Sequence, residues 1–389
     1  MRLIATCPEE TKPALVHELE SLGATDIVPG YRAASFEASD ALYYELHLKL
    51  RTASRLLRIV KDVPAKTPEM LRSQVRRIHW HEIFDARHGF MVESLGAGEE
   101  GGGMPPKQVI TQVREGIREV FERGEGRVPP VDVVDPKVVV VAHLARGRCM
   151  LSLDTSGKSL HKRGYREQGH PAPLKETLAA AILLMAGYDG TQAFLDPMCG
   201  SGTILLEAAS IGLRKAAGLD RSFASQRWEW LGREPWEEVH KEARDLQVRR
   251  AHLRLYGSDI DGRVLKLARE HVAQAGFEGL GLHFQTRDVA DFETSRRYGV
   301  LITNPPYGKR LSSQEEVAAL TETMAEVFGP LHETWSLYFY TGFENFVSHY
   351  GKEPERVRKI YNGTIPCELF QYPGPKPPGL ADPATGQSE

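Results

Sequence analysis

The first part of the chain contains two patterns of apolar and polar residues. Short segments alternate every second residue, which predicts strands, and longer segments repeat an apolar residue every three or four positions, which predicts amphipathic helices. Over residues 1–62 the expected order is strand, helix, strand, strand, helix, strand. Leu15, Leu19 and Leu22 recur at helical spacing, and Ser39 stands where the N-cap of the second helix is expected. This order of elements is typical of a small ferredoxin-like sandwich.

The next stretch predicts a second small α/β unit. Thr67 and Pro68 fit the N-cap and the first position of a helix, and a strand and a long amphipathic helix follow them. Apolar runs within residues 136–157 then predict two strands that form a hairpin turning at Arg146 and Gly147.

From residue 171 onwards helices alternate with short, continuous apolar strands. This alternation favours a doubly wound, mostly parallel sheet. Residues 213–250 interrupt it as an insertion between the first helix and the second strand, and they contain Trp228, Trp230 and Trp236. The fold class expected for the whole chain is therefore α/β.

Length and composition narrow the class of protein. A chain of 389 residues exceeds what one core usually supports, so two or three domains are expected. No apolar run is long enough to cross a membrane and no secretory signal begins the chain, which favours a cytoplasmic protein without a membrane partner. The cysteines are too far apart for a metal knuckle, so reduced thiols and no metal are expected: Cys7, Cys149, Cys199 and Cys367.

The net charge of -3 does not by itself indicate a nucleic-acid partner, but the basic residues are clustered. A solvated helix face is the simpler interpretation of any one cluster. Three clusters upstream of a catalytic motif instead favour contacts with RNA phosphates. The clusters are Lys49, Arg51, Arg55, Arg58 and Lys61; Arg72, Arg76 and Arg77; and Lys158, Lys162, Arg163, Arg166 and Lys175.

A glycine-containing loop, DPMCGSGT at residues 196–203, joins an apolar strand to a helix. It could be an ordinary turn, but Asp259 and Asp288 end the next two strands, where carboxylates can accept bonds from ribose hydroxyls and an adenine amine. The loop lacks the phosphate-binding G-x-G-x-x-G pattern, which favours a ligand without phosphates. S-adenosylmethionine fits, with Asp196 on the side of its ammonium or sulfonium group.

The strand GVLIT runs directly into Asn304-Pro305-Pro306-Tyr307. An exocyclic base amine is a poor nucleophile because its lone pair is delocalised into the ring. The side-chain oxygen of Asn304 and the carbonyl of Pro305 could fix its two hydrogens, and the prolines restrict the loop geometry. Tyr307 could stack on a base extruded from its helix. The alternative is a proline-rich turn after a buried strand.

These motifs carry a resemblance to known families. Residues 171–311 resemble the Rossmann-like class I S-adenosylmethionine-dependent methyltransferases that methylate amino groups. Residues 65–155 resemble a THUMP domain, an RNA-binding module that a ferredoxin-like domain usually precedes. The resemblance implies a ferredoxin-like domain at 1–64, a THUMP domain at 65–155 and a methyltransferase domain at 171–372. The charge of residues 156–170 predicts a basic linker, and the Pro/Gly-rich residues 373–389, which have no periodic apolar pattern, are expected to form a disordered tail.

Three further stretches are similar to bacterial 23S ribosomal RNA guanine-N(2)-methyltransferases: LHKRGYREQGHPAPLKETLAAAIL, the tryptophan-containing insertion and RKIYNGTIPCELFQY. The resemblance implies binding of S-adenosylmethionine by Asp196, Gly200, Gly202, Asp259 and Asp288, and catalysis by Asn304, Pro305, Pro306 and Tyr307. A tRNA guanine-N(2)-methyltransferase and a ribosome assembly factor with an inactive methyltransferase domain are the alternatives. DNA adenine and protein glutamine methyltransferases share the catalytic motif, but the N-terminal domains argue against both.

Overall fold

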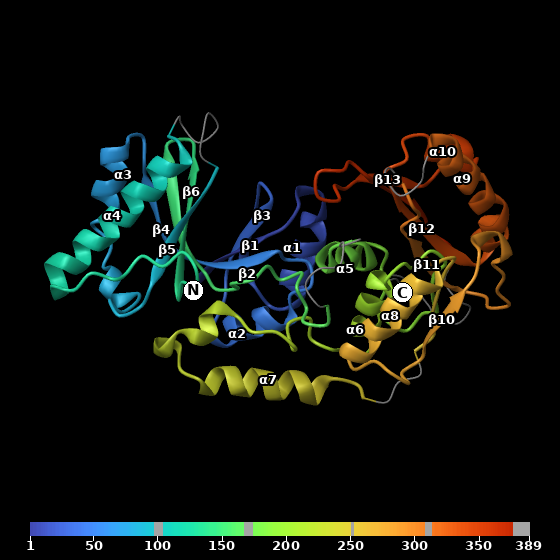
Figure 1. Ribbon diagram of the computed structural model, residues 1–389, viewed down its shortest axis with the longest axis horizontal. Helices are drawn as coiled ribbons and strands as arrows, with labels where there is room; N and C mark the ends of the chain where they lie inside the picture. Colours follow the sequence, from blue (N-terminus) through green and yellow to red (C-terminus); the bar gives the residue numbers. More distant parts are fainter. Residues whose placement is uncertain (97–103, 167–173, 250–252, 308–312, 376–389) are drawn as a thin grey trace, which may run out of the picture. The chain divides into compact units, whose positions relative to one another are not determined.

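The computed structural model describes residues 1–96, 104–166, 174–249, 253–307 and 313–375 (Figure 1). The chain forms two compact units. The first unit comprises residues 1–7, 15–160 and 221–242. The second unit comprises residues 8–14, 161–220 and 243–389. Among the described residues, no helix combines the length and the apolar character that crossing a bilayer requires.

One seven-stranded sheet runs through the first unit, in the order β2-β3-β1-β4-β7-β6-β5. Its strands are β1 (Arg2–Thr6), β2 (Thr25–Gly30), β3 (Ala33–Glu37), β4 (Arg55–Pro64), β5 (Phe90–Leu95), β6 (Val138–Ala145) and β7 (Arg148–Asp154). Strand β4 pairs antiparallel with β1 on one side and with β7 on the other. The two small units expected from the sequence therefore share one continuous sheet.

The helices expected in this part of the chain are present. They are α1 (Lys12–Ser21), α2 (Asp40–Lys49), α3 (Pro68–Val75) and α4 (Pro106–Glu125), with short 3₁₀ turns η1 (Glu9–Thr11) and η2 (Trp80–Glu82). Ser39 and Thr67 cap α2 and α3 through their hydroxyls, as predicted. Arg146 and Gly147 both have positive φ (50° and 73°), which is the backbone of a tight two-residue hairpin.

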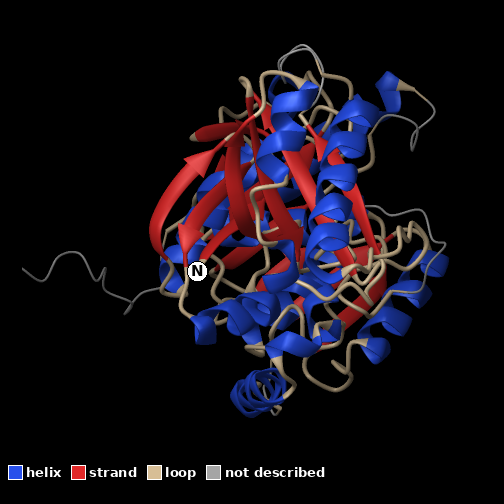
Figure 2. Cartoon of the chain, turned by 90° about the vertical axis from the view of Figure 1, so that its left-hand side faces the viewer, coloured by secondary structure: helices blue, strands red, loops and turns tan. Residues whose placement is uncertain are grey.

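Helix α4 packs on β5 and β6, and α3 packs on β4 and on α4 (Figures 1 and 2). Val109, Val113 and Ile117 repeat at helical spacing on α4 and are fully buried there. Phe90 and Phe121 are also fully buried in this core.

The tryptophan-containing insertion folds onto the first unit, although the sequence analysis assigned it to the methyltransferase stretch. It forms η3 (Ala224–Arg227), η4 (Glu229–Leu231) and α7 (Glu234–Leu246). Trp228 joins the core beneath α3 and α4, and its indole N–H donates to the carbonyl of Lys137 (2.8 Å). Trp236 packs against Tyr44 and His47 of α2. Large apolar rings gain most from burial, and these two are buried in the first unit.

The second unit contains a seven-stranded sheet in the order β10-β9-β8-β11-β12-β14-β13. The strands are β8 (Phe194–Asp196), β9 (Leu255–Asp259), β10 (Leu282–Thr286), β11 (Gly299–Thr303), β12 (Trp335–Thr341), β13 (Arg356–Lys359) and β14 (Glu368–Tyr372). The five strands from β10 to β12 are parallel, and β14 is antiparallel to its neighbours. This confirms the doubly wound, mostly parallel sheet expected from the alternating pattern.

Helices cover both faces of this sheet. On one face, α5 (Glu176–Met185), α6 (Thr203–Gly212) and α8 (Gly262–Gln274) form a first hydrophobic core with the sheet. On the other face, α9 (Gln314–Phe328) and α10 (Phe346–Tyr350) form a second. Successive residues of β11 point to opposite cores: Val300 and Ile302 lie in the first core and Leu301 in the second. The chain leaves β8 towards β9 and later returns to β11 on the other side. The carboxyl ends of β8 and β11 therefore flank the switch point where ligands bind in such sheets.

Candidate active site

Asp196 and Thr303 end the two strands at the switch point. The Thr303 hydroxyl donates to Oδ1 of Asp196 (2.8 Å), and both residues are almost completely buried. Burial raises the pKa of Asp196 from 3.8 to about 7, because a carboxylate loses its hydration there; the Thr303 hydroxyl partly offsets this shift. The negative charge of Asp196 is therefore costly unless a cation or further donors approach it.

The loop after β8 depends on glycine at two positions. Gly200 and Gly202 have positive φ (52° and 82°), a conformation that other residues adopt only with strain. The Gly200 N–H donates to Oδ2 of Asp259 (2.9 Å), so the loop is held against the end of β9. Apart from the neighbours of Gly200 in the chain, no described atom lies within 4 Å of the position that a Cβ on Gly200 would occupy. This leaves space beside the loop for a ligand.

Three predicted acids follow adjacent parallel strands of the sheet. Asp196 ends β8, Asp259 ends β9 and Asp288 comes two residues after β10. The Asp288 side chain is exposed and accepts from the N–H of Ala290 (3.0 Å), capping a 3₁₀ turn, η5 (Val289–Asp291). The carboxyl ends of neighbouring parallel strands meet at one sheet edge, so these acids belong to the same edge.

Two buried polar atoms of the predicted motifs have no hydrogen-bond partner among the described residues. Oγ of Ser201 in the glycine loop and Oδ1 of Asn304 after β11 are buried, with no hydrogen-bond partner in the described part of the chain. Such atoms usually cost about 1–3 kcal/mol unless water or a ligand satisfies them. With the space beside Gly200, these atoms fit a polar ligand that reaches both the loop and the end of β11.

Arg166 also belongs to this group, although sequence reasoning assigned it to RNA. Its guanidinium donates to the hydroxyl of Thr203, the first residue of α6, and pairs with Glu176 (2.9 Å). The Nε atom is buried and has no described partner. The sequence signal was the arginine-rich stretch itself, but charge alone did not distinguish a phosphate contact from a contact beside the glycine loop.

The predicted catalytic tetrapeptide follows β11 directly. Asn304 is half-buried, and Pro305 is buried. Tyr307 is only 7% exposed, and its hydroxyl accepts from the side-chain amide of Asn362 (3.1 Å) and from the thiol of Cys367 (3.3 Å). Its ring is thus held inside the unit, whereas the sequence analysis expected a ring available for stacking. Gly308 lies outside the described residues.

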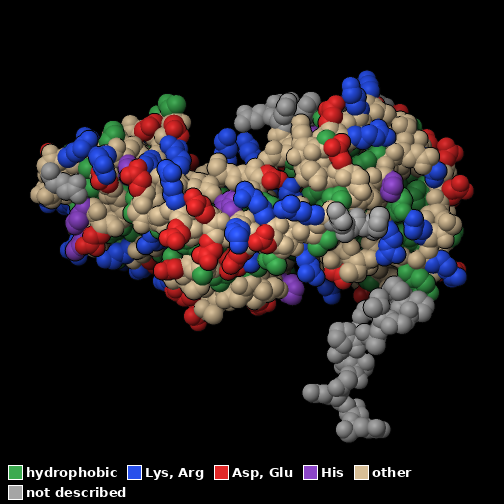
Figure 3. All heavy atoms as spheres, turned by 90° about the horizontal axis from the view of Figure 1, so that it is seen from below, with side chains coloured by type: hydrophobic (Ala, Val, Ile, Leu, Met, Phe, Trp, Pro, Cys, Tyr) green, Lys and Arg blue, Asp and Glu red, His purple; other side chains and the backbone are tan. Residues whose placement is uncertain are grey.

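Several predicted RNA-binding cations have partners inside the protein. Arg163 is 5% exposed and pairs with the buried Glu207 (3.2 Å), because a buried guanidinium requires a carboxylate. The expectation that this basic cluster contacts phosphates is therefore wrong for Arg163, whereas for the partly exposed Arg166 it stays a prediction. In the first unit, Arg72 and Arg76 both pair with Glu119. Figure 3 likewise shows acidic and basic side chains interspersed on the face that it draws.

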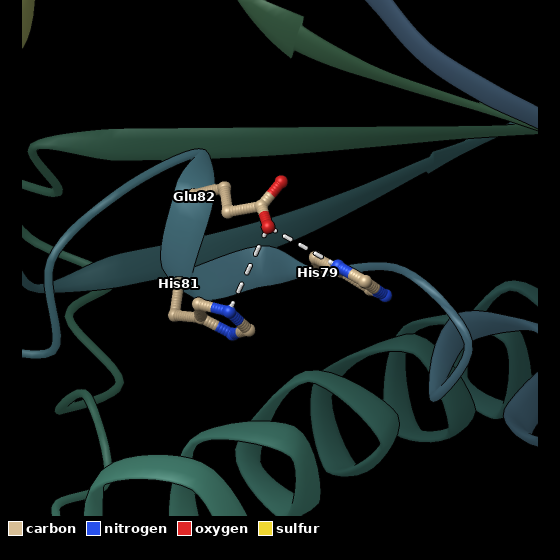
Figure 4. A group of neighbouring side chains, drawn as sticks. All are labelled: His79, His81 and Glu82. Atoms are coloured by element: carbon tan, nitrogen blue, oxygen red, sulfur yellow. Dashed lines mark hydrogen bonds and ion pairs between the residues drawn. The ribbon is translucent and has the colours of Figure 1, made fainter.

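A group of possible metal ligands lies in the first unit. Ligand atoms of His79, His81 and Glu82, in and beside η2, lie within 4.8 Å of one another (Figure 4). All three side chains are exposed, and within the described residues they form the only such group. The four cysteines are free and buried, as expected.

The strand order of the second unit, the glycine loop after β8 and the acids at the strand ends are together the features of class I, Rossmann-like methyltransferases. Residues 163–371 match the RMKL-like methyltransferase domain, residues 2–57 the ferredoxin-like domain of RlmL and residues 65–154 the THUMP domain. The chain therefore belongs to the RMKL-like methyltransferase family.

Relatives with known names match almost the whole of this chain. A putative RNA methyltransferase of Bacillus subtilis, YpsC, is 34% identical, with 95% of each chain covered. A ribosomal RNA large subunit methyltransferase K/L of Syntrophotalea carbinolica is 33% identical over 96% of this chain, which spans 53% of that relative. The chain thus covers about half the length of the K/L enzymes.

Two solved structures share this architecture. A putative methyltransferase, SMU.472, complexed with S-adenosylhomocysteine has 31% identity and a TM-score of 0.88, with 96% of this chain and 98% of that chain covered. A predicted N6-adenine-specific DNA methylase from Listeria monocytogenes has 32% identity and a TM-score of 0.87, with 96% of both chains covered.

Proposed function

We propose that the protein transfers a methyl group from S-adenosylmethionine to the exocyclic N2 amine of a guanine in structured RNA, with 23S ribosomal RNA as the substrate. The observation that carries this proposal is the buried Oδ1 of Asn304, which has no partner among the described residues and is followed in the chain by the carbonyl of Pro305, directly after β11. Two acceptors in sequence at a strand end suit an amine with two hydrogens. A cytoplasmic location follows from this substrate.

The proposed cofactor is supported by the glycine loop and by the S-adenosylhomocysteine bound to the related SMU.472 protein. Asp259 and Asp288 would hold the ribose and the adenine amine, and Gly200 and Gly202 would let the backbone approach the ligand. Asp196 would face the positively charged ammonium or sulfonium group of the cofactor. When bound, this cofactor supplies a methyl group activated by an adjacent positive sulfur.

The protein's contribution to the chemistry is to orient the amine. Asn304 and Pro305 would each accept one N–H of the guanine amine, which directs the nitrogen lone pair away from the base plane. The loop provides no strong base, so a proton would leave after the transfer. Alignment of the reacting atoms accounts for the rate enhancement under this proposal. Pro305 and Pro306 keep the loop rigid at little entropic cost.

The THUMP domain supports RNA as the substrate and argues against the DNA suggested by the name of the Listeria protein. The names of the K/L relatives favour ribosomal RNA. A tRNA guanine-N(2)-methyltransferase remains the second candidate, because the same domain order would serve it. An inactive assembly factor would have no use for a buried, unsatisfied Asn304 Oδ1.

Nucleoside mass spectrometry tests this proposal. Intact ribosomal RNA and tRNA from a deletion strain would each be incubated with and without the purified protein and S-adenosylmethionine, and then digested to nucleosides. N2-methylguanosine should be missing from 23S RNA of the deletion strain and should return after treatment. Its return in tRNA alone would favour the second candidate. Methyl transfer to adenine, or no transfer to any RNA, would contradict the proposal.

A further inference from the structure

The YNG stretch near the end of the chain, which the function proposed above does not explain, reaches the catalytic motif. Asn362 lies in the turn between β13 and β14, where its backbone N–H donates to the carbonyl of Ile365 (2.9 Å) and its carbonyl accepts from the N–H of Ile365 (3.1 Å). Gly363 follows with positive φ (65°). The turn therefore fixes the backbone from which the Asn362 amide contacts Tyr307.

Tyr307 is enclosed on more than one side. Its hydroxyl accepts from Asn362 and from Cys367, which is 3% exposed. Its ring lies against Gly342, the residue after β12: a Cβ there would be 3.0 Å from Cδ2 of Tyr307. A side chain at position 342 would therefore displace the ring or require the neighbouring backbone to move.

The hairpin that supplies these contacts is itself fixed to the sheet. Strand β14 pairs with β12, and the hydroxyl of the buried Tyr340 on β12 donates to the carbonyl of Ile360 (3.1 Å). Ile360 and Cys367 are paired across the hairpin by a backbone bond (2.8 Å). The position of the Tyr307 hydroxyl is thus set by the central sheet and not by the catalytic loop alone.

We propose that Asn362 is a positioning residue for methyl transfer: by donating to the Tyr307 hydroxyl it fixes the loop that carries Asn304 and Pro305. This inference rests on the proposed function. It changes the expected role of the tyrosine, since stacking alone needs no hydroxyl, whereas the observed bonds require one. Asn362 touches neither the reacting amine nor the methyl group in this proposal, and it acts only through Tyr307.

A double-mutant cycle tests the inference. Tyr307→Phe, Asn362→Ala and the double variant would be compared in single-turnover methylation of the RNA, with S-adenosylmethionine affinity and melting temperature measured alongside. Asn362→Ala should slow transfer about tenfold, as expected for one lost hydrogen bond that orients the reacting groups, and Tyr307→Phe, which loses the bonds from both Asn362 and Cys367, should slow it at least as much. The double variant should be no slower than Tyr307→Phe, and cofactor affinity should change less than about twofold.

Controls separate this role from a general loss of structure. Asn345→Ala changes an exposed asparagine at the start of α10 and should leave the rate unchanged. Cys367→Ala removes the other donor and should slow transfer even if Asn362→Ala melts too early to measure. If Asn362→Ala slows the Tyr307→Phe enzyme as much as it slows the wild type, the inference is wrong. A wild-type protein that methylates no RNA refutes the proposed function, and the inference falls with it.

Discussion

Replacing Asp196 by asparagine should stabilise the fold at alkaline pH. The pKa of this buried carboxyl is raised from 3.8 to about 7, so at pH 8 the folded protein bears a charge that burial disfavours. A raised pKa contributes stability below pH 4 that is progressively lost up to about pH 7. At 1.36 kcal/mol per pKa unit the full loss is about 4 kcal/mol at pH 8, compared with about 1.5 kcal/mol at pH 5.

Asparagine is uncharged, retains an acceptor for the Thr303 hydroxyl and has nearly the same volume. The stability of Asp196→Asn relative to wild type should therefore rise by about 2–3 kcal/mol between pH 5 and pH 8. Urea unfolding of both proteins at the two pH values measures this difference. Thr303→Val provides a control, since it removes the hydroxyl that partly offsets the shift and should lower wild-type stability most at pH 8. A relative stability of Asp196→Asn that is equal at both pH values would refute the reasoning.

Three further predictions concern Asn304, Arg166 and Arg163. Asn304→Ala should slow single-turnover methylation by about a hundredfold or more while S-adenosylmethionine affinity stays within about twofold, because the lost contact acts on the amine in the transition state; equal losses in both would contradict this. Arg166 lies beside the glycine loop with a buried, unpartnered Nε among the described residues, so we expect it to bind the carboxylate end of the cofactor. Arg166→Met should then weaken S-adenosylhomocysteine binding by about tenfold in calorimetry but not that of 5′-methylthioadenosine, which lacks the carboxylate; parallel losses would exclude this contact. Arg163→Met should destabilise the fold by about 3–5 kcal/mol in denaturant unfolding, because it leaves the charge of Glu207 buried without a partner, and adding Glu207→Leu should restore most of that loss. Equal stabilities of the single and double variants would contradict this.

Local patterns predicted the elements and the edge of the sheet that carries the site. Ser39 and Thr67 were recognisable as caps because capping depends on residues within the same turn. The acids at the ends of β8 and β9 were recognisable because strand and helix periods differ, and parallel strands present their carboxyl ends at one edge. These predictions require no knowledge of distant contacts.

Predictions that depended on distant partners failed. The pattern around Arg163 indicated only a positive stretch, because its carboxylate partner, Glu207, is 44 positions away on α6. The contacts of Tyr307 come from residues 55 and 60 positions downstream, so nothing beside the motif indicated an enclosed ring. The ring of Trp236 has to be covered by other apolar side chains, but the periodicity of the sequence does not show which part of the chain supplies them.

The folding of residues 221–242 onto the first unit has a consequence for engineering. The chain passes between the two units five times, at positions 7/8, 14/15, 160/161, 220/221 and 242/243. A catalytic fragment made with a single cut near residue 160 would keep the insertion but lose α2, which covers Trp236. Exchanging RNA-binding units between such enzymes would therefore require a chimera with several matched junctions, and the insertion would have to be transferred together with the N-terminal segments.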